Sequence, residues 1–256
     1  MHDKIINMKK ILITLIAVMV FGAVSSQINP NEKLVYSGSY KMSGLMTQLA
    51  QVTIQNELVK TSKKSFLHCS WELATFSKWD TFFKIRDLYE SYVDPTTLQP
   101  SLYKRNIFEG GYAKTEKYIY AADRRTINST SQRPKKAEEK KTFTVGSNSM
   151  DLVSSIYKLR KIDFSKFKVG QISSFVIIFD EKEYPATIKY MGKETVSAGN
   201  LGKKECFKLS IAAKTNKLKG KDQNLIWITT DARRIPALIE FSIPVGVGQI
   251  ALLTAN

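Results

Sequence analysis

The sequence predicts a mainly β protein, folded as a single strongly curved antiparallel sheet or half-open barrel of about ten strands with one covering helix. Three observations lead to this fold class. Apolar and polar residues alternate over many segments, short turn-like stretches separate those segments, and one helical pattern occurs among them, over about 149–160. Consecutive one-sided strands with short links pair with their neighbours, so a curved antiparallel sheet is the expected result.

The N-terminus has the pattern of an export signal. A basic start is followed by an apolar run over 11–21 and then by small residues up to Ser26. The run is shorter than the about 20 residues of a membrane-spanning helix. We therefore expect residues 1–26 to be a signal peptide cleaved near Ser26 and Gln27. Residues 27–256 then form one β-rich domain, periplasmic or associated with the cell envelope, and not an integral membrane protein.

Basic residues dominate the charge. The chain carries a formal net charge of +16, and loss of the leader, with three lysines and one aspartate, leaves +14. An anionic envelope surface is therefore one candidate partner. The lysines are scattered, which favours an ordinary solvated surface. The densest basic stretch, 129–142, is polar without apolar periodicity, so we expect a mobile loop. No aromatic residues interleave with its lysines, and we predict no nucleic-acid partner.

Alternation locates the strands. In the segment 50–58, apolar residues occupy every second position except Asn56, with polar residues between them. The same pattern recurs over 34–42, 67–73, 184–190, 207–211 and 237–243. Each of these segments is expected to place one face on the core and the other in water.

The helix is predicted from its ends and its stripe. Ser147, Asn148 or Ser149 can serve as the N-cap, and Asp151 would lie in the first turn. The apolar stripe consists of Leu152, Ile156 and Leu159, with Val153 and Tyr157 beside it. Such a stripe suits packing on the concave side of the chain's own sheet, although a partner-binding or membrane-surface helix has the same pattern.

Two strand corners share one sequence pattern, an Asp that ends a strand and a Pro that opens the next. In "WITTDARRIP", Asp231 stands where a strand stops, Arg233 and Arg234 fall in a solvated reversal, and Pro236 opens the returning strand. The stretch from Asp94 to Pro100 repeats this order. A third turn, at "EGGY" over 109–112, reads as a tight hairpin and not as a phosphate loop.

The chain offers few residues for nucleophilic catalysis. Without the leader, His68 is the only histidine, and it should point away from its neighbour Cys69 because adjacent strand residues face opposite sides. Cys206 is out of phase with the apolar residues of its strand, which argues against a disulfide with Cys69, although a bulge could restore the pairing. We predict no metal, cofactor or catalytic site.

An acidic cluster leaves one enzymatic alternative open. Asp87, Glu90 and Asp94 lie close together in the sequence, and paired carboxylates can perform acid–base chemistry. Their position in a strand that ends at a turn favours structural roles.

Several stretches resemble a known bacterial family. These are "RDLYESYVDPTTLQPSLYKRNIFEGGY", "MDLVSSIYKLRKIDF", "KVGQ", "GKKECFKL" and "IWITTDARRIPALIEFSIPVGVGQIALL". In this order they are similar to the domain of unknown function numbered 3108. The resemblance implies an exported protein without an assigned reaction. The two corners also look like those of periplasmic lipoprotein carriers, whose half-open barrels bind acyl chains on the concave face.

These observations lead to three functional hypotheses. The first is a non-catalytic exported envelope protein that binds a lipid or another apolar ligand on its concave face. Its candidate lining residues are Val52, Ile54, Trp71, Tyr190 and Trp227. The second is a structural or partner-binding envelope protein with a filled core. The third is a carboxylate-dependent hydrolase.

Overall fold

A computed structural model describes residues 28–42, 44–213, 224–243 and 246–256. The predicted signal peptide and its cleavage site at Ser26 and Gln27 lie outside these residues. Within them, all strands belong to one open sheet, so the prediction of a mainly β chain with an open, curved sheet is confirmed.

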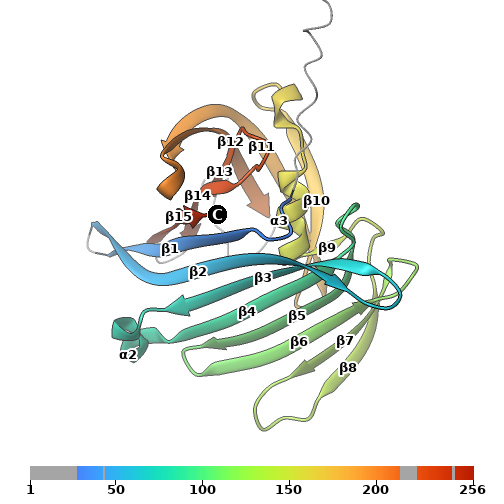
Figure 1. The fold of residues 1–256 in the computed structure, drawn as a ribbon. Coiled ribbons are helices and arrows are strands. Elements are labelled where there is room, and N and C mark those ends of the chain that lie inside the picture. The colour runs from blue at the N-terminus through green and yellow to red at the C-terminus, as the bar shows by residue number, and fades with distance from the viewer. Residues whose placement is uncertain (1–27, 43, 214–223, 244–245) are drawn as a thin grey trace, which may run out of the picture.

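The sheet contains fifteen strands, not about ten, in the order β8-β7-β6-β5-β4-β3-β2-β1-β15-β14-β13-β12-β11-β10-β9. Neighbouring strands are antiparallel except β9, which runs parallel to β10. Their bounds are β1 Lys33–Met42, β2 Leu45–Lys60, β3 Ser65–Thr75, β4 Ile85–Val93, β5 Pro100–Glu109, β6 Tyr112–Tyr120, β7 Thr126–Gln132, β8 Glu139–Thr144, β9 Met150–Asp151, β10 Ile172–Phe179, β11 Lys182–Ser197, β12 Lys203–Ala213, β13 Leu225–Thr229, β14 Pro236–Ile243 and β15 Gly246–Ala255. Because β1 pairs with β15, the first and last strands meet in the middle of the sheet (Figure 1).

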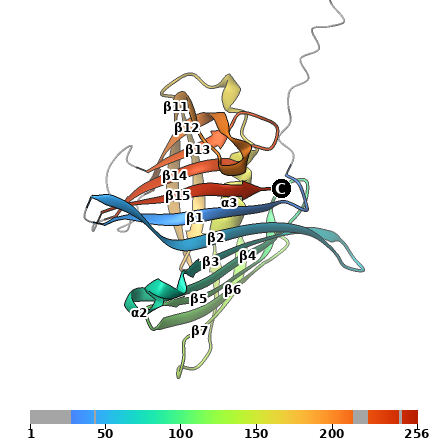
Figure 2. The same cartoon turned by 60° about the vertical axis from the view of Figure 1, so that its left-hand side comes forward.

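The sheet curls so that β2–β8 face β10–β14 across a concave side (Figures 1 and 2). Helix α3, Leu152–Arg160, lies on this side at one end and contacts β3, β4 and β10. It packs Val153 and Tyr157 against Cys69 and Val93 in one core cluster. The other helical elements of the described residues are short: η1 Ser77–Trp79, α2 Asp80–Phe83, η2 Phe164–Lys166 and η3 Gly199–Leu201.

The prediction of a mobile basic loop over 129–142 is wrong, because most of this stretch forms a β-hairpin. Strands β7 and β8 include residues 126–132 and 139–144, and 133–138 connect them. The alternation was invisible because the inward residues of β7 include Ser129 and Ser131. Ser129 donates a hydrogen bond to Glu181 at 2.6 Å, so a polar residue suits this inner face.

Glu181 belongs to the tip of the β10–β11 hairpin, which docks onto the concave face of β5–β7. The backbone N–H of Glu181 donates to the Tyr118 hydroxyl at 2.9 Å. Beside it, Asp180 pairs with Lys114 at 3.1 Å and with the buried Arg105, which also binds Glu116. The hairpin tip therefore fills part of the space that a simple half-barrel would leave open.

Helix α3 begins later than predicted, and a different stripe is buried. Its N-cap is Asp151, whose carboxylate accepts the N–H of Ser154 at 2.8 Å, and not a residue of 147–149. The most buried stripe is Val153, Tyr157 and Arg160, while Leu152 and Ile156 are only partly buried. The prediction of the buried stripe failed because the Arg160 side chain has a binding partner far away in the sequence.

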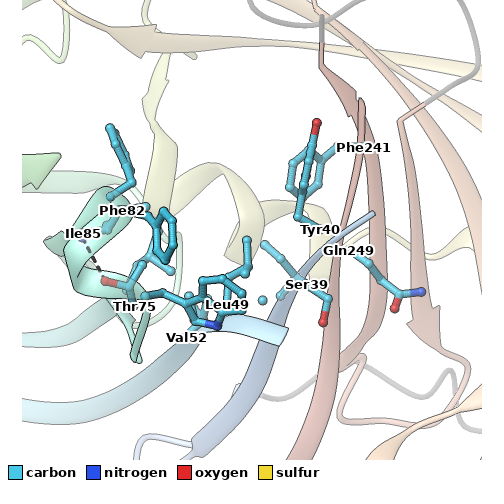
Figure 3. A pocket seen from close by; sticks show the side chains of 15 residues that line it. Ser39, Tyr40, Leu49, Val52, Thr75, Phe82, Ile85, Phe241 and Gln249 are labelled. Carbon is cyan, nitrogen blue, oxygen red and sulfur yellow. Dashed lines mark hydrogen bonds between the residues drawn. The ribbon is translucent and has the colours of Figure 1, made fainter. Parts of the chain in front are cut away.

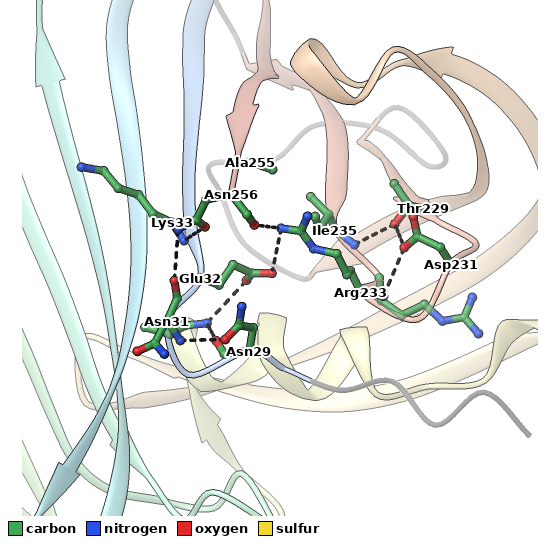
Figure 4. Close-up of polar contacts among 12 residues, drawn as sticks. Asn29, Asn31, Glu32, Lys33, Thr229, Asp231, Arg233, Ile235, Ala255 and Asn256 are labelled. Carbon is green, nitrogen blue, oxygen red and sulfur yellow. Dashed lines mark hydrogen bonds and ion pairs between the residues drawn. The ribbon is translucent and has the colours of Figure 1, made fainter.

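That partner is Glu32, and the pair forms the centre of a buried polar network. The Arg160 guanidinium contacts both carboxylate oxygens of Glu32, at 2.8 and 2.9 Å. It also donates to the backbone carbonyls of Arg233 and Arg234 at 2.9 and 3.0 Å. The network thus joins α3 to the chain before β1 and to the corner between β13 and β14, where Arg233 lies near Glu32 and Asn256 (Figure 4).

Both predicted corners occur, with Pro236 opening β14 and Pro100 opening β5. Asp231 accepts hydrogen bonds from Thr229 and from the Arg233 N–H, at 2.9 and 3.1 Å (Figure 4). The expectation that Arg234 is solvated is wrong. Its side chain is buried, 4.7 Å from the ring centroid of Phe207 and 3.7 Å from Asp163.

Candidate apolar-ligand site

A cavity of about 420 Å³ occupies the end of the concave face that α3 leaves uncovered. Along β3, the inward residues Cys69 and Trp71 pack in the helix-covered core, and the next inward residues, Leu73 and Thr75, line the cavity. The opposite wall comes from the other half of the sheet (Figure 3). The lining consists of Gly38, Ser39, Tyr40, Leu49, Ala50, Val52, Leu73, Thr75, Trp79, Phe82, Phe83, Ile85, Phe241, Gln249 and Ile250.

Small residues create the floor of this cavity. Gly38 on β1 pairs with Ala50 on β2, and the β1–β2 register shifts directly after Gly38. With neither position carrying a large side chain, the inner face is hollow at a point where two bulky residues would fill it. On the next strands, Gly248 lies opposite Phe241, and a Cβ atom at Gly248 would collide with the phenylalanine ring.

The segment η1–α2 forms one wall and is tied to the sheet by polar contacts. Asp80 accepts a hydrogen bond from Thr75 at 2.6 Å and pairs with Arg86 at 2.6 Å. The Trp79 indole N–H donates to the carbonyl of Gln48 at 2.9 Å. Thr75 also accepts the backbone N–H of Ile85 at 3.0 Å (Figure 3). These contacts hold Phe82 and Phe83 beside the cavity without adding a charge to its lining.

The chemistry of the lining favours hydrocarbon. Most of its residues are aliphatic or aromatic. The Thr75 hydroxyl already donates a hydrogen bond to Asp80 and accepts one from the backbone N–H of Ile85. Cavities of about 300–1,000 Å³ with mainly apolar walls are typical of small-ligand sites. Asp87 is a buried carboxyl that pairs with the lining residue Leu73 in the β3–β4 register. Burial and then the neighbouring Glu109 raise the pKa of Asp87 to about 7, so this carboxyl is protonated in mildly acidic solution.

The structure does not bring the five predicted lining residues together. Val52 lines the cavity. Ile54 and Trp71, paired with one another across β2 and β3, lie one inward step further toward α3 and pack in the core. Tyr190 lies in another cluster, stacked on Phe164 with ring centroids 6.4 Å apart.

Trp227 was predicted on the wrong face. Tyr190, Leu209 and Ile226 are successive partners across β11, β12 and β13, so the next residue, Trp227, points to the opposite side of the sheet. There the Lys208 ammonium lies 5.2 Å from its ring centroid, and its N–H donates to Glu194 at 3.3 Å. The strand is buried on both faces, and alternation cannot identify the inner face of such a strand.

The three acidic residues proposed for a hydrolase contact different partners. Asp87 is buried and accepts the N–H of Phe108 at 3.1 Å. Glu90 pairs with His68 at 2.9 Å, and the second ring nitrogen of His68 contacts Glu57 at 3.0 Å. Asp94 accepts the backbone N–H groups of residues 96 and 97 in the corner before β5. Each carboxylate thus has its own structural contacts.

The cysteine geometry agrees with the alternation argument. Cys69 and Cys206 are both buried, unbonded to one another, and belong to different core clusters. His68 stacks on Tyr92 with ring centroids 4.2 Å apart, away from Cys69. Among the described residues, no group of three His, Cys, Asp or Glu side chains is placed to hold a metal ion.

Sequence reasoning missed the aromatic wall of the cavity. Phe82 and Phe83 belong to a four-residue helix, which is too short to show helical periodicity. Phe241 lies in the alternating segment 237–243, but alternation alone does not mark a residue as part of a site. The usable signal was the pair of glycines, 38 and 248, inside strands, because glycine within a strand often marks a close approach or an opening.

A second cavity of about 480 Å³ lies between α3 and β10–β11. Its lining includes Leu159, Ile162 and Phe175, together with Lys158 and several serines. It is more polar than the first cavity. No helix in the described part of the chain combines the length and hydrophobicity that crossing a membrane requires.

Three solved structures are similar to this chain, and the first of them shares its fold. A solved β-barrel-like protein of the domain of unknown function 1849 from Brucella abortus is similar, with a TM-score of 0.58 at 10% identity over 90% of this chain and 98% of the other. A protein from Parabacteroides distasonis described as a "putative lipoprotein" gives a TM-score of 0.37 at 10% identity, covering 90% and 97%. A "putative exported protein" with a YmcC-like fold from Bacteroides fragilis gives 0.34 at 7% identity, also covering 90% and 97%.

No curated protein matches the sequence. The family model of DUF3108, described as a protein of unknown function, matches residues 35–253. This match confirms the resemblance drawn from the sequence stretches that run from the fourth strand to the last. The chain therefore belongs to the DUF3108 family.

Proposed function

We propose that this protein is a non-catalytic exported envelope protein that binds a lipid acyl chain, or a ligand of similar apolarity, in the cavity beside α2. The observation that carries the proposal is the cavity itself, about 420 Å³ of space with an almost wholly apolar lining. The opening of the cavity leaves this apolar lining in contact with water, which is unfavourable in proportion to the apolar area. Binding of hydrocarbon would remove that area from water.

The position of the cavity in the fold favours a binding site over a packing defect. Strand pairing continues through β3, β2, β1 and β15 on its floor, so the site is built on rigid elements. The wall made by α2 is anchored through Asp80 and Trp79. Export is supported by the N-terminal signal pattern.

A non-catalytic role is supported by the state of the titratable groups. Asp87, Glu90 and Asp94 engage different partners, and both ring nitrogens of His68 contact carboxylates. None of these four residues lines the cavity. Hydrolysis would need a nucleophile, a base and an oxyanion site gathered around one substrate position.

Binding of a fluorescent fatty acid to the purified protein tests the proposal. Val52→Trp places an indole in the cavity and should weaken binding at least about tenfold, about 1.4 kcal/mol. Gln51→Trp is the matched control, because Gln51 is the exposed neighbour on the opposite face of β2. Equal probe affinity in wild type and Val52→Trp, with no lipid retained in native mass spectrometry, would refute the proposal.

A structural or partner-binding role is the second candidate. It is favoured by the filled part of the concave face, where α3 and the tip with Asp180 and Glu181 already occupy the space. That role predicts no saturable probe binding. Retention on envelope fractions that weakens with added salt would support it.

A further inference from the structure

Apolar side chains are exposed around the mouth of the cavity. Phe82 is 81% exposed, Leu45 75% and Phe83 53%, and Met46 and Val247 are exposed as well. Single exposed apolar residues are ordinary, but a group of them beside an apolar opening marks an interaction surface. We call these five residues the apolar rim.

The three segments that carry the apolar rim converge on the same end of the sheet. Leu45 and Met46 lie a few residues before Leu49, which lines the cavity, at the start of β2. Val247 directly precedes Gly248, which pairs with Tyr40 and Phe241, two more lining residues. Phe82 and Phe83 line the cavity themselves. Figures 1 and 2 show the start of β2, the end of β1 and α2 at this end in both views.

The charge around the apolar rim is positive. Lys41, Lys78 and Lys84 are exposed and lie next to its members in the sequence or in the β1–β2 pairing, where Lys41 is opposite Met46. The acidic residue of α2, Asp80, is paired with Arg86 at 2.6 Å, which holds the pKa of the Asp80 carboxyl below its usual value. The three exposed lysines therefore add positive charge beside hydrocarbon, and the ammonium groups of Lys78 and Lys84 lie 5.7 and 6.0 Å from the ring centroids of Trp79 and Phe108.

We propose that the apolar rim and its three lysines form a docking surface for an anionic lipid bilayer. Aromatic and aliphatic side chains enter the boundary between headgroups and acyl chains, while the lysines contact anionic headgroups. In this orientation the cavity mouth faces the bilayer, so an acyl chain passes from the membrane to the cavity without crossing water. Only this last step rests on the proposed function. Docking itself depends on the exposed residues.

Co-sedimentation with vesicles tests the docking. The full mature chain should pellet with vesicles of phosphatidylcholine and phosphatidylglycerol, and less with phosphatidylcholine alone or in high salt. Leu45→Ser combined with Met46→Ser should lower the partition coefficient at least about tenfold, because two apolar anchors are lost. Lys41→Gln combined with Lys84→Gln should lower it on anionic vesicles alone, by about fivefold per lysine.

Two controls separate docking from folding and from ligand binding. Leu58→Ser combined with Ile119→Ser removes two apolar side chains that are 44% and 45% exposed but lie away from the cavity, and should leave the partition coefficient unchanged. Val52→Trp should keep vesicle binding while losing the fatty-acid probe. Conversely, the Leu45 and Met46 variant should bind the probe normally in the absence of vesicles, because neither residue lines the cavity.

Docking is refuted if wild type stays in the supernatant with anionic vesicles, or if the Leu45 and Met46 variant pellets like wild type. Equal binding to neutral and anionic vesicles would refute the role of the lysines. Sedimentation velocity covers a further outcome. A wild-type dimer that the same variant dissociates, without any vesicle binding, would show that a second copy of the chain covers the apolar rim, and would also overturn the proposal.

Discussion

Arg160 and Glu32 form a buried ion pair, 128 residues apart, that closes the domain at the end where α3 lies. Breaking one member leaves an uncompensated charge in the core, which costs about 3–5 kcal/mol. We therefore expect Arg160→Met and Glu32→Gln each to lower the free energy of unfolding by about that amount in urea denaturation.

The control for this ion pair is an exposed one. Lys193 and Glu205 lie 2.9 Å apart with both side chains about half exposed. Glu205→Gln should cost less than about 1 kcal/mol. A loss of similar size in Arg160→Met and Glu205→Gln would contradict the role given to the buried network.

Asp87 should make the protein less stable as the pH rises. Burial and Glu109 raise its pKa to about 7, above the about 3.9 of an unfolded chain. Between these values the folded state holds a proton that the unfolded state has released, so the free energy of unfolding falls with rising pH. Asp87→Asn should reduce the fall between pH 5 and pH 8 by about 2 kcal/mol.

Asp94→Asn is the matched control for this pH effect. Backbone N–H groups lower the pKa of Asp94, so its contribution is lost only as the pH falls through that lowered pKa, well below pH 5. This variant should leave the difference between pH 5 and pH 8 unchanged. An unchanged difference in Asp87→Asn would mean that Asp87 is ionised in the folded protein throughout this range.

The two thiols should be unreactive in the folded protein and free after unfolding. Burial raises the pKa of Cys69 and of Cys206 to about 12, and the thiolate is the reactive form. Titration with a thiol reagent at pH 8 should find slow reaction in buffer and two thiols per chain in urea without reductant. Detection of no thiols in urea would show a disulfide instead.

Local patterns predicted those parts of the fold whose environment is local. Alternation located β2, β3 and β11, and the Asp-to-Pro device located the corners before β5 and β14. Strand β7 was missed because its inward Ser129 is matched to Glu181, 52 residues later. The burial of Arg160 likewise depends on Glu32, which no pattern around α3 could indicate.

Only one lining residue of the candidate site, Val52, was predicted from the sequence, because alternation reports only on the strand in which it occurs. Val52 belongs to a strand with one wet face, where alternation identifies the inner side. Trp227 belongs to a strand buried on both sides, where alternation is uninformative. Phe82 reaches the cavity because Asp80 and Arg86 hold a short helix against the sheet, a tertiary arrangement without a sequence period.

Gly248 and Phe241 should be energetically coupled, because the ring of Phe241 occupies the space that a Cβ atom at Gly248 would need. Gly248→Ala should therefore lower the free energy of unfolding by about 1–3 kcal/mol, as overpacking does, and should push the ring toward the cavity and weaken fatty-acid binding. Phe241→Ala alone removes cavity wall and also destabilises the protein. In the double variant the collision is gone, so its loss of stability should be smaller than the sum of the two single losses. A double-mutant cycle by urea denaturation measures this coupling, and additive losses would show that the sheet relaxes around Gly248 without moving Phe241.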